Sequence, residues 1–188
     1  MLRRALLLVA TFAATNAGAE TIVVDQAADL ADADPNDGTP DVDLANPGLQ
    51  VSLRSAIEHA NLVVGMDRIE LEVAAPLMPA ALPEVTDRLE LDGAIPNGRA
   101  TLQQSLVLRA GGCTIEHLII ANAPADGITS HATGTVSLVD VDLIQNAGLG
   151  LRARGEVRID GALVNGSAQV VGWFSGVPRR MQSGYLYH

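Results

Sequence analysis

Short apolar runs return along the middle of the chain at a nearly constant interval, and each run ends in a turn rich in Asn, Asp or Gly. Three of these runs end on an asparagine, at Asn122, Asn146 and Asn165. The runs are rich in Ile, Val and Leu and are too short for helices, so they predict strands. An interval of roughly 20 to 25 residues is typical of a repeat architecture whose coils stack on one another.

These patterns predict a mainly β protein, a right-handed parallel β-helix that forms a single-stranded solenoid of three to four coils. Within each strand, alternation places one side chain in the core and the next outside. Asparagines at the same corner of successive coils are expected to stack, because each amide would satisfy backbone groups that an apolar side chain leaves unpaired. A sandwich of short antiparallel strands is the alternative that the patterns leave open.

A helical pattern precedes the repeats. Apolar residues at Leu53, Ala56 and Ile57 recur at helical spacing after Ser52, a residue type that caps helix N-termini. We expect this short amphipathic helix to cover the open end of the first coil, since the end of a repeat stack must be capped to stay soluble. His59 is expected on or near the polar face, in contact with solvent.

The chain opens with the three parts of a secretory signal peptide, which are early arginines, an apolar run and a small-x-small sequence at residues 17–19. We expect residues 1–19 to be removed and the mature chain to begin at Glu20. This leader predicts an exported protein, located in the periplasm, in the medium or at the cell surface. The apolar run is too short for a permanent anchor, so the mature chain is not expected to span a membrane.

Charge and composition narrow the possible partners. Removal of the leader takes away two of the 12 basic residues and none of the 22 acidic ones, which leaves a net charge of −12. Such a surface repels nucleic acid. All basic residues are arginine, and Cys113 is the single cysteine, so no intramolecular disulfide can form. We expect Cys113 to be a small buried thiol and not a nucleophile.

An acidic loop between residues 25 and 47 is the candidate metal site. Its oxygen-bearing side chains recur at every second position around Gly38, a spacing with which loops wrap oxygen ligands around Ca²⁺. The glycine falls one position later than an EF-hand requires, and no bidentate Glu closes the loop. A solvated acidic loop is therefore the alternative. The candidate calcium ligands are Asp32, Asp34, Asn36, Asp41 and Asp43.

The run from Val51 to Ile57, Val-Ser-Leu-Arg-Ser-Ala-Ile, together with the Gly-x-Asp-x-Ile pattern that starts at Gly65, resembles the CSLREA-motif domain of exported bacterial β-helix proteins. The resemblance covers roughly residues 20–155. It implies a secreted or surface β-helix of the pectin-lyase-like fold and brings no catalytic residues. The chain departs from the motif at Val51 and Ser55, so any role of the family's Cys and Glu is absent. The matching positions, which are expected to be structural, are Ser52, Leu53, Arg54, Ala56 and Ile57.

The end of the chain resembles a different family. Residues 159–188, which close on Gln-Ser-Gly-Tyr-Leu-Tyr-His, are similar to the C-terminal region of subunit L of the proton-pumping NADH:quinone oxidoreductase. None of that family's proton-channel residues has a counterpart here, so a fused, shifted or truncated reading frame is the expectation. The expected division is then a signal peptide (1–19), a strand and acidic loop (20–50), a capping helix and first strands (51–84), coils (85–165) and an aberrant tail (166–188).

The coils carry few residues that are candidates for catalysis or ligand binding, and no catalytic residue is assigned. Asp140 and Asp142 are separated by one position on an expected strand, so both would face the same way. They could share a cation or act as acid and base, whereas pairing with Arg152 and Arg154 on the next coil explains them without catalysis. Other candidates considered on the coils are Asp92, Asp126, Arg109 and His131.

The first functional hypothesis is a non-catalytic, exported β-helix module, an incomplete N-terminal part of a larger adhesin-like or carbohydrate-interacting protein. Its expected partner is a glycan or another cell-surface component, and Ca²⁺ is the one cofactor considered. The second hypothesis is a remnant of a polysaccharide lyase or hydrolase. Whether the chain is an enzyme therefore stays open, and the absence of enzymatic activity is favoured. The third is a fragment of the respiratory subunit that the tail resembles.

Overall fold

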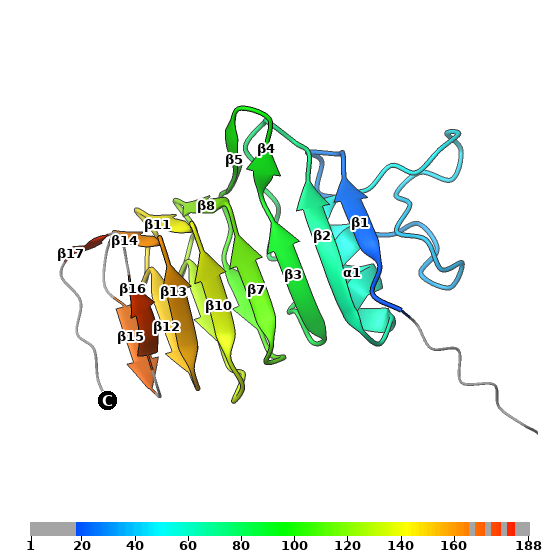
Figure 1. Cartoon of the computed structure of the whole chain (residues 1–188). Coiled ribbons are helices and arrows are strands. Elements are labelled where there is room, and N and C mark those ends of the chain that lie inside the picture. The colour runs from blue at the N-terminus through cyan, green and yellow to red at the C-terminus, as the bar shows by residue number, and fades with distance from the viewer. Residues whose placement is uncertain (1–17, 166–167, 172–173, 178–179, 183–188) are drawn as a thin grey trace, which may run out of the picture.

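The computed structural model describes residues 18–165, 168–171, 174–177 and 180–182. Its strands form three sheets with parallel pairing between coils, and these sheets wrap into a β-solenoid of about four turns (Figure 1). One short helix lies at the N-terminal end of the described part. The predicted parallel β-helix is thereby confirmed, and the antiparallel sandwich is excluded. The one antiparallel pairing in the described residues is a small hairpin between β4 and β5.

Strand order within each sheet follows the order of the coils, and the central coils contribute to all three sheets. The first sheet contains β1 (Thr21–Val24), β2 (Met66–Leu71), β3 (Arg88–Asp92), β7 (Cys113–Glu116), β10 (Val136–Val139), β13 (Val157–Asp160) and β16 (Phe174–Val177). The second contains β4 (Ala94–Ile95), β5 (Gly98–Leu102), β8 (Leu118–Ala121), β11 (Asp142–Ile144), β14 (Leu163–Asn165) and β17 (Arg180–Gln182). The third contains β6 (Leu106–Leu108), β9 (Ile128–Ser130), β12 (Leu151–Arg154) and β15 (Ala168–Val171).

The core is a stack of aliphatic side chains from successive coils. In the first sheet the register aligns five inward-facing residues, each at most 1% exposed: Ile69, Leu91, Ile115, Leu138 and Ile159. Their neighbours along each strand face outward, as the predicted alternation requires. Cys113 is part of this interior, and burial raises the pKa of its thiol, which confirms the expectation of a buried cysteine.

The corner between the first and second sheets repeats one backbone conformation. His117, Asp140 and Gly161 follow β7, β10 and β13 and have φ angles of 49°, 51° and 65°. Asp and His tolerate this left-handed region better than most residues. Gly93 occupies the same corner one coil earlier, where an added Cβ would lie 2.5 Å from the carbonyl oxygen of His117. The corner thus fixes where the side chains of His117 and Asp140 leave the coil.

The predicted asparagine ladder is wrong in its register. The last residues of β8 and β11 are register partners, so the residues that follow them, Asn122 and Gln145, are aligned, with φ angles of 57° and 53°. Asn165 aligns with Ile144 and is not a rung of the same column. Asn146 nevertheless makes the expected hydrogen bonds to the backbone. Its amide accepts a hydrogen bond from the Ala123 backbone nitrogen at 3.0 Å and donates to the Ile120 carbonyl at 3.3 Å.

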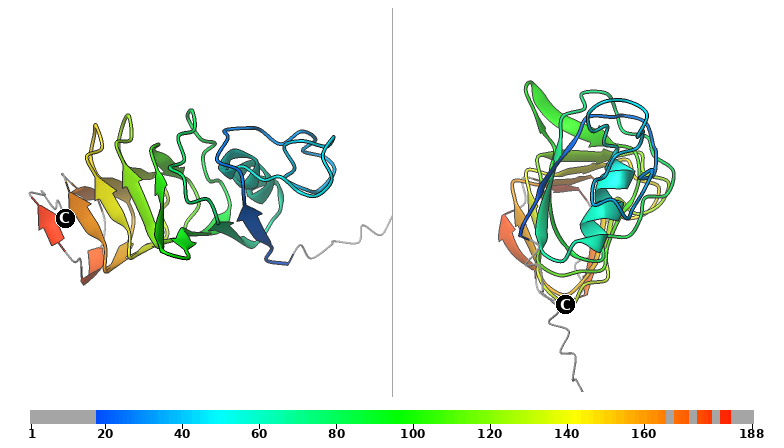
Figure 2. Two further views of the ribbon diagram at one scale, coloured as in Figure 1. Left: turned by 90° about the horizontal axis from the view of Figure 1, so that it is seen from above. Right: turned by 90° about the vertical axis from the view of Figure 1, so that its right-hand side faces the viewer.

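The predicted helix is α1 (Leu53–Leu62), with Ser52 as its N-cap. The Ser52 hydroxyl accepts a hydrogen bond from the backbone nitrogen of Ser55, and the Ser55 hydroxyl accepts one from the backbone nitrogen of Ser52. Ser55, where the CSLREA pattern has Glu, therefore completes a capping box. The buried face, which includes Ala56 and Ile57, lies against β1 and β2 at the N-terminal end (Figure 2). The helix thus has the predicted capping position.

His59 does not face solvent as expected. Its side chain is 4% exposed, and its Nε2 lies 3.2 Å from a carboxylate oxygen of Glu20. Helical spacing places this residue near the polar face, but Glu20, the residue before β1, lies against it.

Arg54 of α1 connects three separate segments. Its guanidinium donates two hydrogen bonds to the Asp29 carboxylate, at 2.8 and 3.1 Å, and a third to the Ala81 carbonyl at 2.9 Å. Asp29 also accepts a hydrogen bond from the Ala80 backbone nitrogen at 2.8 Å. Burial alone would raise the pKa of Asp29, but the bonds from Arg54 and Ala80 hold it below its ordinary value.

Replacing Arg54 with methionine is expected to lower the free energy of unfolding by about 1–3 kcal/mol, because Asp29 loses its charged donor. Since the pKa of Asp29 is lowered in the folded state, this loss should be complete above about pH 4 and disappear as the pH falls through the folded-state pKa. Urea unfolding at pH 7 and pH 3 measures both effects. Arg154→Met, on the exposed end of β12, is the matched control and should change the free energy of unfolding by less than about 0.5 kcal/mol.

The C-terminal segment continues the solenoid in its described parts. β15, β16 and β17 pair in parallel with β12, β13 and β14, so each of the three sheets gains a strand. These strands therefore keep the architecture of the preceding coils. Within the described residues, no helix has the length and apolar character needed to cross a membrane.

Candidate functional site

Outward-facing side chains of the first sheet form a column of carboxylates. The parallel register aligns Glu70 of β2 with Asp92 of β3, and Asp92 with Glu116 of β7. In the neighbouring outward column, Arg68 aligns with Glu90. Adjacent strands lie about 4.8 Å apart, so these like charges would repel one another without a cation between them.

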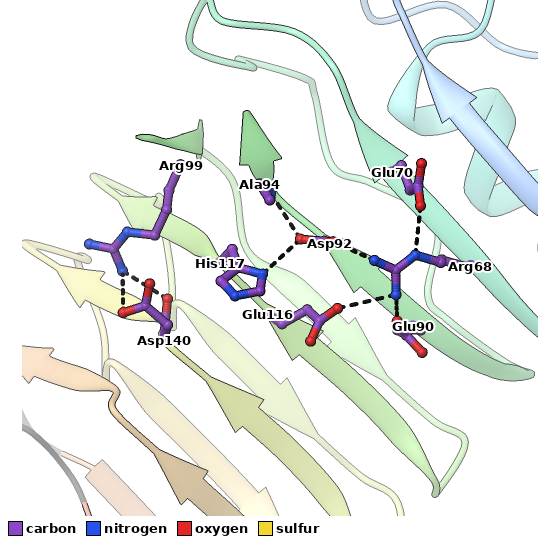
Figure 3. Close-up of polar contacts among 9 residues, drawn as sticks. All are labelled: Arg68, Glu70, Glu90, Asp92, Ala94, Arg99, Glu116, His117 and Asp140. Atoms are coloured by element: carbon purple, nitrogen blue, oxygen red, sulfur yellow. Dashed lines mark hydrogen bonds and ion pairs between the residues drawn. The ribbon is translucent and has the colours of Figure 1, made fainter. Parts of the chain in front are cut away.

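Arg68 supplies that cation. Its guanidinium lies 2.7 Å from Glu70 and 3.2 Å from Glu116, and it also forms ion pairs with Glu90 and Asp92 (Figure 3). The hydrogen bond to Glu70 is the largest cause that raises the pKa of Arg68, and the neighbouring carboxylates raise it further against the opposing effect of burial. Arg68 therefore stays charged, and one guanidinium holds side chains from three strands.

His117 extends the group at the corner. Its Nδ1 lies 2.9 Å from Oδ1 of Asp92, which also accepts a hydrogen bond from the Ala94 backbone nitrogen at 2.9 Å. The side chain of His117 is 39% exposed, whereas that of Asp92 is 12% exposed. We call the six residues Arg68, Glu70, Glu90, Asp92, Glu116 and His117 the Arg68 cluster.

Part of this cluster has the donors of a divalent-cation site. Asp92, Glu116 and His117 each offer one ligand atom, and these atoms all lie within 4.8 Å of one another. A histidine nitrogen beside two carboxylate oxygens suits a first-row transition metal better than calcium. However, Arg68 and the Ala94 amide already bond to the same carboxylates. The geometry therefore favours an ion-pair ladder, and a metal would have to displace Arg68.

Asp140 and Asp142 come together, but not as predicted. They do not share a strand, because Asp140 is the corner residue after β10 and Asp142 begins β11. Arg99 of β5 joins them. It donates a hydrogen bond to the Asp140 carbonyl at 2.8 Å, lies 3.5 Å from the Asp140 carboxylate and forms an ion pair with Asp142. Pairing with an arginine was expected, but the structure places it on an earlier coil.

The other two surface candidates lie on β12 of the third sheet. The Nε of Arg152 lies 2.5 Å from the Asp126 carboxylate, which also accepts a hydrogen bond from the Leu149 backbone nitrogen at 2.8 Å. Burial opposes the charged form of Asp126, but these bonds hold the pKa of this carboxyl below its ordinary value. Arg154 is exposed at the end of the strand. The described structure thus places these residues on a different sheet from the Arg68 cluster.

The acidic loop uses several of its side chains to bind its own backbone. Asp32, Asp34, Asp41 and Asp43 each accept a hydrogen bond from the backbone nitrogen of the second residue after them, at 3.0 to 3.1 Å. Such turns shape a loop without a metal. Asn36 donates to Asp34 at 3.4 Å. The assignment of these five residues to calcium stays a prediction.

Sequence reasoning considered Asp92 but missed the rest of the Arg68 cluster. Glu70, Asp92 and Glu116 occupy equivalent positions on three successive strands of the first sheet, so they recur once per coil. A search for charges that recur at the coil interval would have found the column. Its partner Arg68 could not be recognised in this way, because it lies in the neighbouring column.

No protein family, curated protein or solved structure shows a significant match to this chain. Its function has therefore to be inferred from its residues and its fold.

Proposed function

We propose that this chain is an exported, non-catalytic β-helix module, part of an adhesin-like protein, and that the outward face of its first sheet contacts a glycan at the cell surface. The sequence supports export through the leader at residues 1–19 and through the resemblance to the CSLREA-motif domain of pectin-lyase-like proteins. The Arg68 cluster is the observation that supports a non-catalytic module. In this cluster one arginine bonds to the carboxylates of Glu70, Glu90, Asp92 and Glu116.

A carboxylate that acts as acid, base or nucleophile needs access to the substrate and a pKa suited to the step. In this cluster, Arg68 lies against each carboxylate, and Asp92 is 12% exposed. The same face carries Ser137, Arg158, Asp160 and Ser175, which line a shallow hollow over β10, β13 and β16. Hydroxyl, guanidinium and carboxylate groups are suited to hydrogen bonding with sugar hydroxyls, and the acidic net charge favours a neutral glycan.

The test is incubation of the purified chain with neutral and acidic polysaccharides, followed by measurement of reducing ends and unsaturated products. We expect no product above that of a heat-denatured sample, and saturable binding of a neutral glycan that Arg158→Ala weakens. Product formation that is lost in Asp92→Asn and retained in Asp160→Asn, a change on the same face, would overturn the proposal. Absence of binding to any neutral glycan would contradict the proposed contact with a glycan.

One observation favours the alternative, a remnant of a polysaccharide lyase or hydrolase. Asp92, Glu116 and His117 present three convergent donor atoms on the outer face of a parallel sheet, where a divalent cation could bridge to an acidic sugar. Adding Mn²⁺, Zn²⁺ or Ca²⁺ to the same assay tests this alternative. It predicts product only with the metal, and no product in His117→Ala.

A further inference from the structure

Asp67 is a buried carboxylate at a core position. It lies in β2, where the register aligns it with the apolar Leu89, and it is 0% exposed. Its Oδ1 accepts a hydrogen bond from the Glu20 backbone nitrogen at 3.1 Å. Its Oδ2 is buried and has no hydrogen-bond partner among the described residues. Buried carboxylates are normally paired with a cation, so one amide donor leaves Asp67 unexplained.

Glu20 is held in place by three contacts. Besides the bond to Asp67, its carboxylate lies 3.2 Å from Nε2 of His59, and its carbonyl accepts a hydrogen bond from the Arg68 backbone nitrogen at 2.7 Å. The backbone nitrogen of Glu20 is therefore aimed at the buried carboxylate. Glu20 is also the residue at which the sequence predicts the mature chain to begin.

We propose that Asp67 is the binding site for the α-ammonium group that cleavage between Ala19 and Glu20 creates. This inference rests on the export part of the proposed function. Cleavage adds water across the Ala19–Glu20 amide bond, which leaves a carboxylate on Ala19 and an ammonium on Glu20. One neutral N–H donor thereby becomes a cation with three donors beside the Asp67 carboxylate.

The consequence is a folded state that gains stability when the leader is removed. The new ion pair would join the start of β1 to β2, the first strand pair of the solenoid. In the uncleaved chain the hydrogen bond that Asp67 accepts comes from a neutral amide. Processing would thus complete the N-terminal end of the fold.

Other charged groups near Asp67 set the pH dependence. Burial is the largest cause that raises the pKa of Asp67, and the carboxylates of Glu20 and Asp87 and the ring of His59 also act on it. An α-amino group has an ordinary pKa of about 8, and pairing with a carboxylate raises it in the folded state. The added stability should therefore be present below about pH 8 as long as Asp67 is ionised, and it should be lost as the pH rises through the folded-state pKa of the amine.

The absence of lysine gives a direct test. In a chain that begins at Glu20, the α-amino group is the one amine, so an acylating reagent followed by intact-mass measurement reports on that group alone. We expect acylation about tenfold slower than in a chain that begins at Ala19, with equal rates in denaturant. Equal rates in the two folded chains would overturn the proposal.

Thermal unfolding is the second measurement. The chain that begins at Glu20 should melt roughly 5 °C higher than the chain that begins at Ala19. Asp67→Asn should abolish this difference, whereas Glu72→Gln, an exposed change beside the same strand, should preserve it. A difference that survives in Asp67→Asn would contradict the assignment. If this variant does not fold, the acylation comparison decides.

These measurements use purified chains and do not depend on export. Export is tested separately by N-terminal sequencing of protein recovered from the periplasm or medium. A mature end other than Glu20 would contradict the assumed cleavage. Protection of the Glu20 amine would still show that Asp67 can bind it.

Discussion

Replacing Ile115 with alanine is expected to lower the free energy of unfolding by about 2–5 kcal/mol. Ile115 is 0% exposed and lies between Leu91 and Leu138 in the column of inward-facing residues. Each coil is stabilised mainly by its neighbours, so a cavity here weakens two interfaces between coils. Urea unfolding followed by circular dichroism measures the loss.

The matched control for Ile115→Ala is Thr114→Ala, which changes the adjacent outward-facing residue of the same strand. It should change the free energy of unfolding by less than about 0.5 kcal/mol. Equal losses in the two variants would mean that Ile115 does not face the core.

Replacing Arg68 with methionine is expected to cost about 1–3 kcal/mol at low ionic strength. The substitution keeps much of the side-chain volume but leaves four carboxylates without the cation that lies among them. Added salt should reduce the loss by screening the repulsion. Ca²⁺ should restore stability further, because the freed oxygens are the ligands that this ion prefers.

Arg158→Met is the control for this charge effect. Arg158 is on the same sheet, but its side chain is 63% exposed, and its ion-pair partner is Glu156 at 3.1 Å. We expect almost no loss of stability and no response to Ca²⁺. A loss in Arg68→Met that does not depend on salt would show that packing, and not charge, explains the role of Arg68.

The sequence was sufficient to predict the coil architecture, because strand alternation and the repeat interval are both visible in the order of apolar and polar residues along the chain. It also located the helix from Ser52 and the spacing of Leu53, Ala56 and Ile57. The asparagine register was wrong because successive coils differ in length. The pairing aligns Ile144 with Ala121 on one side and with Asn165 on the other, so Asn122 lies at the level of Gln145 and not of Asn146.

The site was harder to predict than the fold, because its contacts depend on register between distant residues. Arg68 contacts Glu116 on β7, and His59 contacts Glu20 before β1, although each pair is far apart in the sequence. Local helical spacing placed His59 near solvent, since nothing local indicates that Glu20 lies over it. Asp140 and Asp142 were assigned to one strand because the corner at Asp140 contains no glycine that would have predicted a turn there. The left-handed conformation of Asp140 became visible only in the structure.

Successive coils of this solenoid stack in parallel and in register. A disulfide between Ser137→Cys and Arg158→Cys, in a Cys113→Ala background, tests this arrangement, because these two outward positions are register partners on β10 and β13. Peptide mapping after mild oxidation should find this cross-link in high yield, since paired Cα atoms lie within disulfide reach. Ser137→Cys with Asp160→Cys, a pair that is out of register, should give little. Equal yields, or a preference for the second pair, would contradict the parallel register.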